Sequence, residues 1–157
     1  METLGGRGPM SLAAEEDWFE RLQDEQGTKR WHFVICLRED GRPVGTAGLE
    51  SVDLVNGRAE LGIAIGERDC RDRGYGTEAV GALLDFAFGE LRLERVFLYV
   101  FDGNDRAIHV YEKLGFRLEG TLRHSCFRHG RWLDTHIMGI LLDEWRAQGR
   151  PRSWEVD

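Results

Sequence analysis

The sequence predicts a single α/β domain built on one mixed, mostly antiparallel sheet with helices on both faces. In the first half, short apolar segments are separated by Asp-Gly and Asn-Gly pairs, which are signals of β-hairpin turns. After Gly74, apolar residues instead recur every three to four positions, as in a helix. A buried strand, Arg95–Phe101, follows, and a strand–helix–strand connection of this kind makes the two strands parallel. A chain of 157 residues fits one domain.

The first half is predicted to be one helix followed by an antiparallel meander. Residues 1–10 form a loose lead-in, and Ser11 can cap a helix with apolar residues at three-to-four spacing. Turns are expected at Asp40-Gly41 and Asn56-Gly57. The strands that they separate are Trp31–Leu37, Val44–Leu54 and Arg58–Ile65.

The second half is predicted to hold two helices and three strands. The long helix runs from Gly74 to about Leu91, and a short one follows Arg95–Phe101 over Asp105–Leu114, where Gly115 ends it. A last hairpin pairs Arg117–Phe127 with Trp132–Leu141. Residues 146–157 are expected to be a solvated, flexible tail, so residues 1–157 form one domain.

Composition excludes several classes of function. The formal net charge of −7 argues against a nucleic-acid-binding protein and suits a cationic substrate such as an amine. Three widely spaced cysteines, Cys36, Cys70 and Cys126, indicate reduced thiols and neither a disulfide framework nor a metal site. The start carries no secretory signal, and no apolar run is long enough to cross a bilayer. We therefore expect a cytoplasmic protein that binds no membrane and no metal.

The segment Arg71–Thr77 is the most informative part of the chain. Its glycines lie between an apolar strand and a long helix, so that backbone N–H groups and the positive end of the helix dipole converge on one spot. Such a spot binds a phosphate or pyrophosphate, and Arg71 and Arg73 can add positive charge. No ribose-binding acidic residue follows at dinucleotide-fold spacing, and no Lys-Ser/Thr completes a P-loop. The alternative is that these glycines serve packing alone.

The stretch from Ala59 to Trp145 resembles the GNAT superfamily of acetyl-CoA-dependent N-acetyltransferases. The residues Arg71-Asp72-Arg73-Gly74-Tyr75-Gly76 match the family's pyrophosphate loop, and the segment from Asn104 to Phe116 matches its second cofactor-side motif. The continuation through Glu119–Arg123 and Gly130–Asp134 is similar to the branch of ribosomal-protein N-terminal acetyltransferases and spermidine acetyltransferase. The resemblance implies a GNAT-like fold, with acetyl-CoA as co-substrate and an amine as acceptor.

The resemblance also implies roles for individual residues. The strand residues Ile63, Ala64 and Ile65 would hold the pantetheine arm and offer an N–H group to the thioester carbonyl, and the Asn104 side chain would bond the pantetheine or the reacting centre. The pyrophosphate would bind the amides of Arg71, Asp72, Arg73, Gly74, Tyr75, Gly76 and Thr77.

An amine acceptor must lose a proton before it attacks, and the leaving thiolate needs a proton donor. Tyr111 stands at the family's acid position, seven residues after Asn104; otherwise it is a packing residue. Glu60 is the candidate base, unless it is merely solvated on an open sheet face. His109 and His136 are weaker candidates for the base, and Cys70 is interpreted as structural because direct attack needs no covalent step.

The start of the chain departs from the family pattern. Relatives usually carry a strand and a helix ahead of this part, whereas the roughly thirty residues before Trp31 hold only one helix. Without the first strand, Trp31–Leu37 should be an exposed sheet edge. We therefore predict a homodimer with that edge or the last hairpin in the interface. Besides an N-acetyltransferase, two alternatives remain: a non-catalytic acyl-CoA-binding protein with an incomplete acceptor site, and a nucleotide-phosphate-binding module.

Overall fold

The structure, a computed structural model, describes residues 11–66, 70 and 73–155, and its strands form one six-stranded sheet in the order β1-β2-β3-β4-β6-β5. The strands are β1 (Trp31–Cys36), β2 (Pro43–Asp53), β3 (Arg58–Ile65), β4 (Arg95–Phe101), β5 (Arg117–Arg128) and β6 (Arg131–Leu141). The helices are α1 (Leu12–Glu25), α2 (Tyr75–Asp85), α3 (Asp105–Lys113) and α4 (Leu142–Arg146), with a π-helical segment η2 (Phe86–Glu90) after α2. Each predicted strand and helix is present, and β1 is an edge strand as expected.

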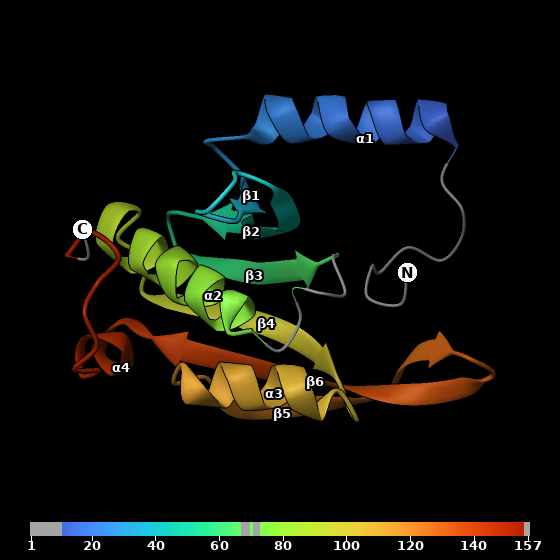
Figure 1. The fold of residues 1–157 in the computed structure, drawn as a ribbon. Helices are drawn as coiled ribbons and strands as arrows, with labels where there is room; N and C mark the ends of the chain where they lie inside the picture. The colour runs from blue at the N-terminus through green and yellow to red at the C-terminus, as the bar shows by residue number, and fades with distance from the viewer. Residues whose placement is uncertain (1–10, 67–69, 71–72, 156–157) are drawn as a thin grey trace.

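One parallel pair interrupts an otherwise antiparallel sheet, which confirms the predicted mixed topology. β3 and β4 are parallel and pair through three residue pairs, the last of which is Glu60 with Phe97. Beyond it the two strands separate, as Figure 1 shows between the green and yellow arrows. β2 continues to pair with β3, and β6 with β4, over the separated part. The sheet therefore opens in its middle while remaining hydrogen-bonded on both sides of the opening.

A single hydrophobic core covers one face of this sheet. Because side chains alternate along a strand, the buried Leu49, Leu61 and Val96 point to the same face, where they meet side chains of α2, α3 and Trp145 of α4. α1 adds no described side chain to this core, and its Trp18 and Phe19 are exposed. Figure 1 draws α1 beyond β1, at the edge of the sheet.

The long helix changes its hydrogen-bonding pattern near its end. The sequence predicts one helix to Leu91, but from Phe86 it continues as the π-helical η2, and the Leu91 N–H bonds to the Phe86 carbonyl. The ring of Trp154 fills the space beside Gly89, where a Cβ would lie 2.7 Å from the ring. Gly89 is therefore needed for the close approach of the C-terminal segment.

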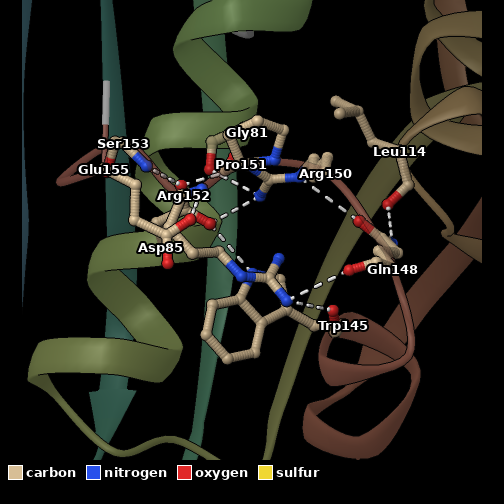
Figure 2. A network of polar contacts seen from close by, with 10 residues as sticks. All are labelled: Gly81, Asp85, Leu114, Trp145, Gln148, Arg150, Pro151, Arg152, Ser153 and Glu155. Carbon is tan, nitrogen blue, oxygen red and sulfur yellow. Dashed lines mark hydrogen bonds and ion pairs between the residues drawn. The ribbon is translucent and has the colours of Figure 1, made fainter. Parts of the chain in front are cut away.

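Residues 146–155 do not form the expected solvated tail, because they fold back onto α2 around a fully buried carboxylate. Asp85, 0% exposed, accepts hydrogen bonds from Trp145 Nε1 at 2.9 Å and from the Ser153 amide at 2.7 Å (Figure 2). Arg150 donates to both Asp85 oxygens, at 2.6 and 3.1 Å, and to the Gly81 carbonyl. Arg152 stacks on the Trp145 ring at 3.9 Å. The segment is thus clamped to the end of α2.

Asp85 stays charged in this environment. Burial acts to raise the pKa of its carboxyl, but the bonds from Arg150, the Ser153 amide and Trp145 outweigh burial, so the pKa lies below its ordinary value. A lowered pKa means that the network stabilises the fold above the unfolded-state pKa of about 3.9. That stabilisation is lost as the pH falls through the lower folded-state value.

We expect Arg150→Ala to lower the free energy of unfolding by about 3 kcal/mol at neutral pH, because it leaves a buried carboxylate without its cation. Arg146→Ala is the matched control, since Arg146 and Asp143 form a largely exposed ion pair and its loss costs at most about 0.5 kcal/mol. Urea denaturation measures both. Equal losses in the two variants would show that the Asp85 network stabilises no more than a surface pair does.

Candidate functional site

A cavity of about 450 Å³ lies where β3 and β4 separate. Its walls come from the end of β3, the start of α2, the end of β4 and one side of α3. Residues predicted from the sequence to bind or react with the co-substrate line it together: Ile63, Ala64, Ile65, Gly74, Tyr75, Gly76, Thr77, Asn104 and Tyr111. The fold thus brings to one cavity segments that are far apart in the chain.

Strand edges on both sides of the opening lack a strand partner in the described structure. Residues 61–65 of β3 pair with β2 alone, and residues 98–101 of β4 pair with β6 alone. The backbone groups that face the opening are therefore available to an extended ligand that carries amides. This agrees with the prediction that Ile63, Ala64 and Ile65 hold a pantetheine arm, which remains a prediction.

The start of α2 has the geometry of an anion site. Gly74 adopts a left-handed conformation, with φ of +84°, and no side chain caps the helix, whereas Ser11 caps α1. The first amides of α2 thus lack intrahelical partners and lie at the positive end of the helix dipole. A Cβ at Gly74 or Gly76 would meet no described atom within 4 Å, so the described residues leave space in front of them. These residues fit a pyrophosphate.

The basic residues of the loop are only partly assigned. Arg71 and Asp72 lie outside the described residues. Arg73 is exposed, and its guanidinium lies 5.5 Å from the centre of the Tyr75 ring, so in this structure it stacks on α2 and does not line the cavity. Cys70, 1% exposed, lines the cavity and accepts a bond from Arg42 at 3.5 Å, in keeping with a structural thiol.

Asn104 has a structural task besides its predicted one. Its Oδ1 accepts a bond from the Ala107 amide at 3.4 Å and so caps α3. Its Nδ2 group is the part that can donate to a ligand in the cavity. The predicted bond to pantetheine or to the reacting centre can come from this group, or from a donor on the ligand to the second lone pair of Oδ1.

Tyr111, predicted to be the acid, is a buried residue that lines the cavity. It is 9% exposed, its ring packs edge-on against Phe116, and its hydroxyl makes no hydrogen bond within the described part of the chain. Burial raises the pKa of the Tyr111 phenol. The hydroxyl therefore keeps its proton at neutral pH and can donate it to an atom bound in the cavity.

Glu60 does not line this cavity with Tyr111. It alternates with the buried Ala59 and Leu61, so its carboxyl lies on the opposite face of the sheet, at the last residue pair before β3 and β4 separate. Burial raises the pKa of the Glu60 carboxyl, and the nearby negative charge of Glu50 raises it further. A carboxylate in this position is a stronger base than an exposed one.

Of the two histidines that are weaker candidates for the base, the structure places only one in the cavity. His109 lines the cavity from α3. His136 instead bonds to Thr121 at 2.9 Å and to Asp102 at 3.3 Å. Sequence reasoning missed Tyr99, Phe101 and Arg106, which line the cavity from β4 and α3. The sequence could have indicated Tyr99 and Phe101, because the end of β4 borders the same opening as the end of β3, its parallel neighbour.

The described residues contain no group of three His, Cys, Asp or Glu side chains placed to hold a metal ion. Within the same residues, no helix is long and apolar enough to cross a membrane.

Comparison with known proteins identifies the family. Residues 1–117 match the model of the family described as "Acetyltransferase (GNAT) domain". The chain belongs to the GNAT acetyltransferase family. An uncharacterized N-acetyltransferase of Bacillus licheniformis is 34% identical over 72% of this chain and 63% of its own length. Spermidine N(1)-acetyltransferase of Escherichia coli is 32% identical over 84% of this chain and 68% of its own length. The chain thus spans about two thirds of these relatives.

Solved GNAT structures show the same fold. One is the structure of spermidine N-acetyltransferase from Vibrio cholerae in complex with CoA and spermine. It is 25% identical to this chain, with a TM-score of 0.82, and the match covers 90% of this chain and 81% of the Vibrio cholerae chain. A dodecameric structure of that enzyme is 25% identical, with a TM-score of 0.79 over 89% and 80% of the two chains. The predicted GNAT-like fold and family are therefore confirmed, and GNAT enzymes use acetyl-CoA.

We expect Gly76→Glu to weaken acetyl-CoA binding roughly 100-fold, about 2.8 kcal/mol, because it places a carboxylate in the open space before the first turn of α2. Gly76→Ala is the control, since a methyl group there meets no described atom within 4 Å and leaves the backbone amides in place. Titration calorimetry with acetyl-CoA measures both dissociation constants. Unchanged binding by the Glu variant would place the pyrophosphate elsewhere.

Proposed function

We propose that this GNAT protein transfers an acetyl group from acetyl-CoA to a primary amine by direct attack. One observation carries the proposal: a single cavity is lined by the uncapped start of α2, the unpaired edge of β3 and the buried Tyr111 hydroxyl. Binding, orientation and proton donation are thereby available in one place. Cavities with few polar groups converging on them are the usual form of small-molecule sites.

In this proposal each wall of the cavity has a task. Amides at residues 74–77 hold the pyrophosphate, and the separated edge of β3 holds the pantetheine arm as an added strand would. An N–H group of Ile63, Ala64 or Ile65 donates to the thioester carbonyl as negative charge develops there. Acetyl-CoA supplies the activated acetyl group, and the chain supplies position and protons.

Two groups on opposite faces of the sheet move the protons. An aliphatic ammonium group has a reference pKa of about 10.4, so it must give up a proton before its nitrogen can attack. Glu60 accepts this proton, because its raised pKa makes it a better base than an ordinary carboxylate. Tyr111 donates the proton on its Oη to the departing sulfur. The acceptor therefore approaches from the face opposite α2 and α3.

The acceptor is proposed as a polyamine, a protein N-terminus or a small amine. The names of relatives that act on spermidine support a polyamine, and the net charge of −7 suits any cationic acceptor. One observation favours the alternative of a non-catalytic acyl-CoA-binding protein. α1 adds no described side chain to the core and exposes Trp18 and Phe19, so its described residues form no packed wall that would enclose an acceptor.

A thiol-release assay with acetyl-CoA and a panel of amines tests the function. Spermidine, aminoglycosides and N-terminal peptides of ribosomal proteins represent the proposed acceptor classes. Release that depends on one amine supports a transferase and assigns its class. Binding of acetyl-CoA by calorimetry, together with no release from any amine, supports the non-catalytic alternative.

We expect Tyr111→Phe to lower turnover by roughly 10²-fold or more while acetyl-CoA affinity changes little, because the ring that packs on Phe116 stays and only the proton donor is lost. Steady-state rates and a calorimetric dissociation constant separate the two effects. A variant with wild-type turnover would remove Tyr111 from the mechanism.

We also propose that the chain forms a homodimer in the cytoplasm. Among the described residues, β1 pairs with β2 alone and so forms an edge of the sheet, and its Phe33 and Val34 are exposed, which is a surface that proteins usually cover. Light scattering at tens of micromolar is expected to give twice the mass of one chain. The mass of a single chain would contradict the dimer. A larger assembly would also contradict it and would resemble the dodecamer of the Vibrio cholerae enzyme.

A further inference from the structure

Glu60 has a carboxylate neighbour on the adjacent strand. Glu50 of β2 is its direct partner in the antiparallel register, next to the pair Leu49 and Leu61. Because Leu49 and Leu61 point into the core, Glu50 and Glu60 both point to the opposite face. Side chains directly opposite on one face of a sheet have Cβ atoms about 5 Å apart, so two like charges there repel each other.

The Glu50 carboxylate has positively polarised partners, whereas the Glu60 carboxyl has none among the described residues. His32 Nε2, on β1, is hydrogen-bonded to Glu50 Oε1, and Arg30 Nε lies 3.5 Å from Glu50 Oε2. Arg30 is itself paired with Glu25 at 2.8 Å. In the described part of the chain, the Glu60 carboxyl makes no hydrogen bond or ion pair. The charge of the pair is thus stabilised on Glu50, and the repulsion falls on Glu60.

Other charged groups on this face are paired among themselves. On β3, Arg58 lies two residues before Glu60 and pairs with Asp53 of β2 at 3.5 Å. On β4, Arg95 lies two residues before Phe97, the partner of Glu60, and forms two 2.7 Å bonds with Glu119 of β5. Both arginines are therefore occupied by other carboxylates. Neither removes the effect of Glu50 on Glu60.

We propose that Glu50, held by His32 and Arg30, is a positioning residue that keeps Glu60 basic enough to take a proton from the acceptor ammonium group. In this step an N–H bond of the ammonium breaks, an O–H bond forms on Glu60, and the freed nitrogen lone pair attacks the acetyl carbonyl. Glu50 acts through Glu60 and touches neither reactant. The inference rests on the proposed function, in which Glu60 is the base.

The direction of the effect follows from charge. The negative charge of Glu50 disfavours ionised Glu60 and so raises the pKa of Glu60, in addition to the effect of burial. Removing that charge lowers the pKa of Glu60. The acidic limb of the kcat/KM profile then moves to lower pH, and the plateau above it falls, because a weaker base takes the proton less readily.

Glu50→Gln tests the inference, with Glu50→Asp as the variant that keeps the charge and Glu94→Gln as a control that removes an exposed charge elsewhere. Carbon-13 NMR of glutamate-labelled protein, without ligand, follows the Glu60 carboxyl through a pH titration, and Glu60→Gln assigns its signal. We expect Glu60 to titrate at lower pH in Glu50→Gln than in the wild type. Glu50→Asp and Glu94→Gln should leave it close to the wild-type position.

Activity with spermidine as the acceptor gives the second measurement. We expect Glu50→Gln to lower the plateau of kcat/KM roughly tenfold, with the acidic limb moved to lower pH and the KM for spermidine little changed. An acidic limb that stays in place, or a loss confined to KM, overturns the inference. Circular dichroism checks folding, and Glu50→Ala is the second variant if the Gln protein does not fold.

The two measurements separate this inference from the proposed function. An unmoved Glu60 titration in Glu50→Gln overturns the coupling, whatever the enzyme does. A moved titration together with full activity of Glu60→Gln shows that the coupling exists but that Glu60 is not the base, which overturns the role of Glu50 in the reaction. A moved titration, an inactive Glu60→Gln and a shifted acidic limb support both proposals.

Discussion

The rest of the structure depends on how short the parallel pairing of β3 and β4 is. The Gly57 carbonyl accepts bonds from the Glu94 and Arg95 amides at 2.7 and 3.0 Å, which fixes the closed end of the pair. Three residue pairs later the strands separate. β2 and β6 hold the outer edge of each strand, so the sheet stays intact while two inner edges become free. Exposed edges are usually a liability, but inside a cavity they are a binding surface.

Helix α2 connects this opening to the most buried charge in the described structure. Its uncapped start lines the cavity, and about 15 Å away, at 1.5 Å per residue, its end is fixed by Asp85 and the segment that carries Arg150 and Trp145. The start cannot be anchored by a side-chain cap without occupying the anion site. An anchor at the other end leaves the amides at the start free, so the end that stabilises the fold differs from the end that we propose binds the pyrophosphate.

Local signals made the architecture and much of the site predictable from the sequence, and long-range pairing hid the rest. Turn residues set the strands, and the glycines of the loop with Tyr111 pointed to the cavity that the structure contains. The clamp on Asp85 joins residues 60 to 68 positions apart, and its donors, Arg150 and Ser153, look like an ordinary polar tail in sequence. The pairing of Glu50 with Glu60 was likewise hidden, because it requires the strand register.

The sheet separates the two proposed proton-transfer groups, Tyr111 and Glu60, by the polarity of their surroundings as well as by position. Tyr111 lies in the core on the helix face, whereas Glu60 lies on the open face beside a second carboxylate. Burial raises the pKa of both groups, and the proposed reaction uses the two shifts differently: the phenol keeps its proton until the sulfur leaves, and the carboxylate becomes a better base toward an ammonium group. The opening between β3 and β4 lets the reacting atoms meet both groups while the sheet keeps them apart.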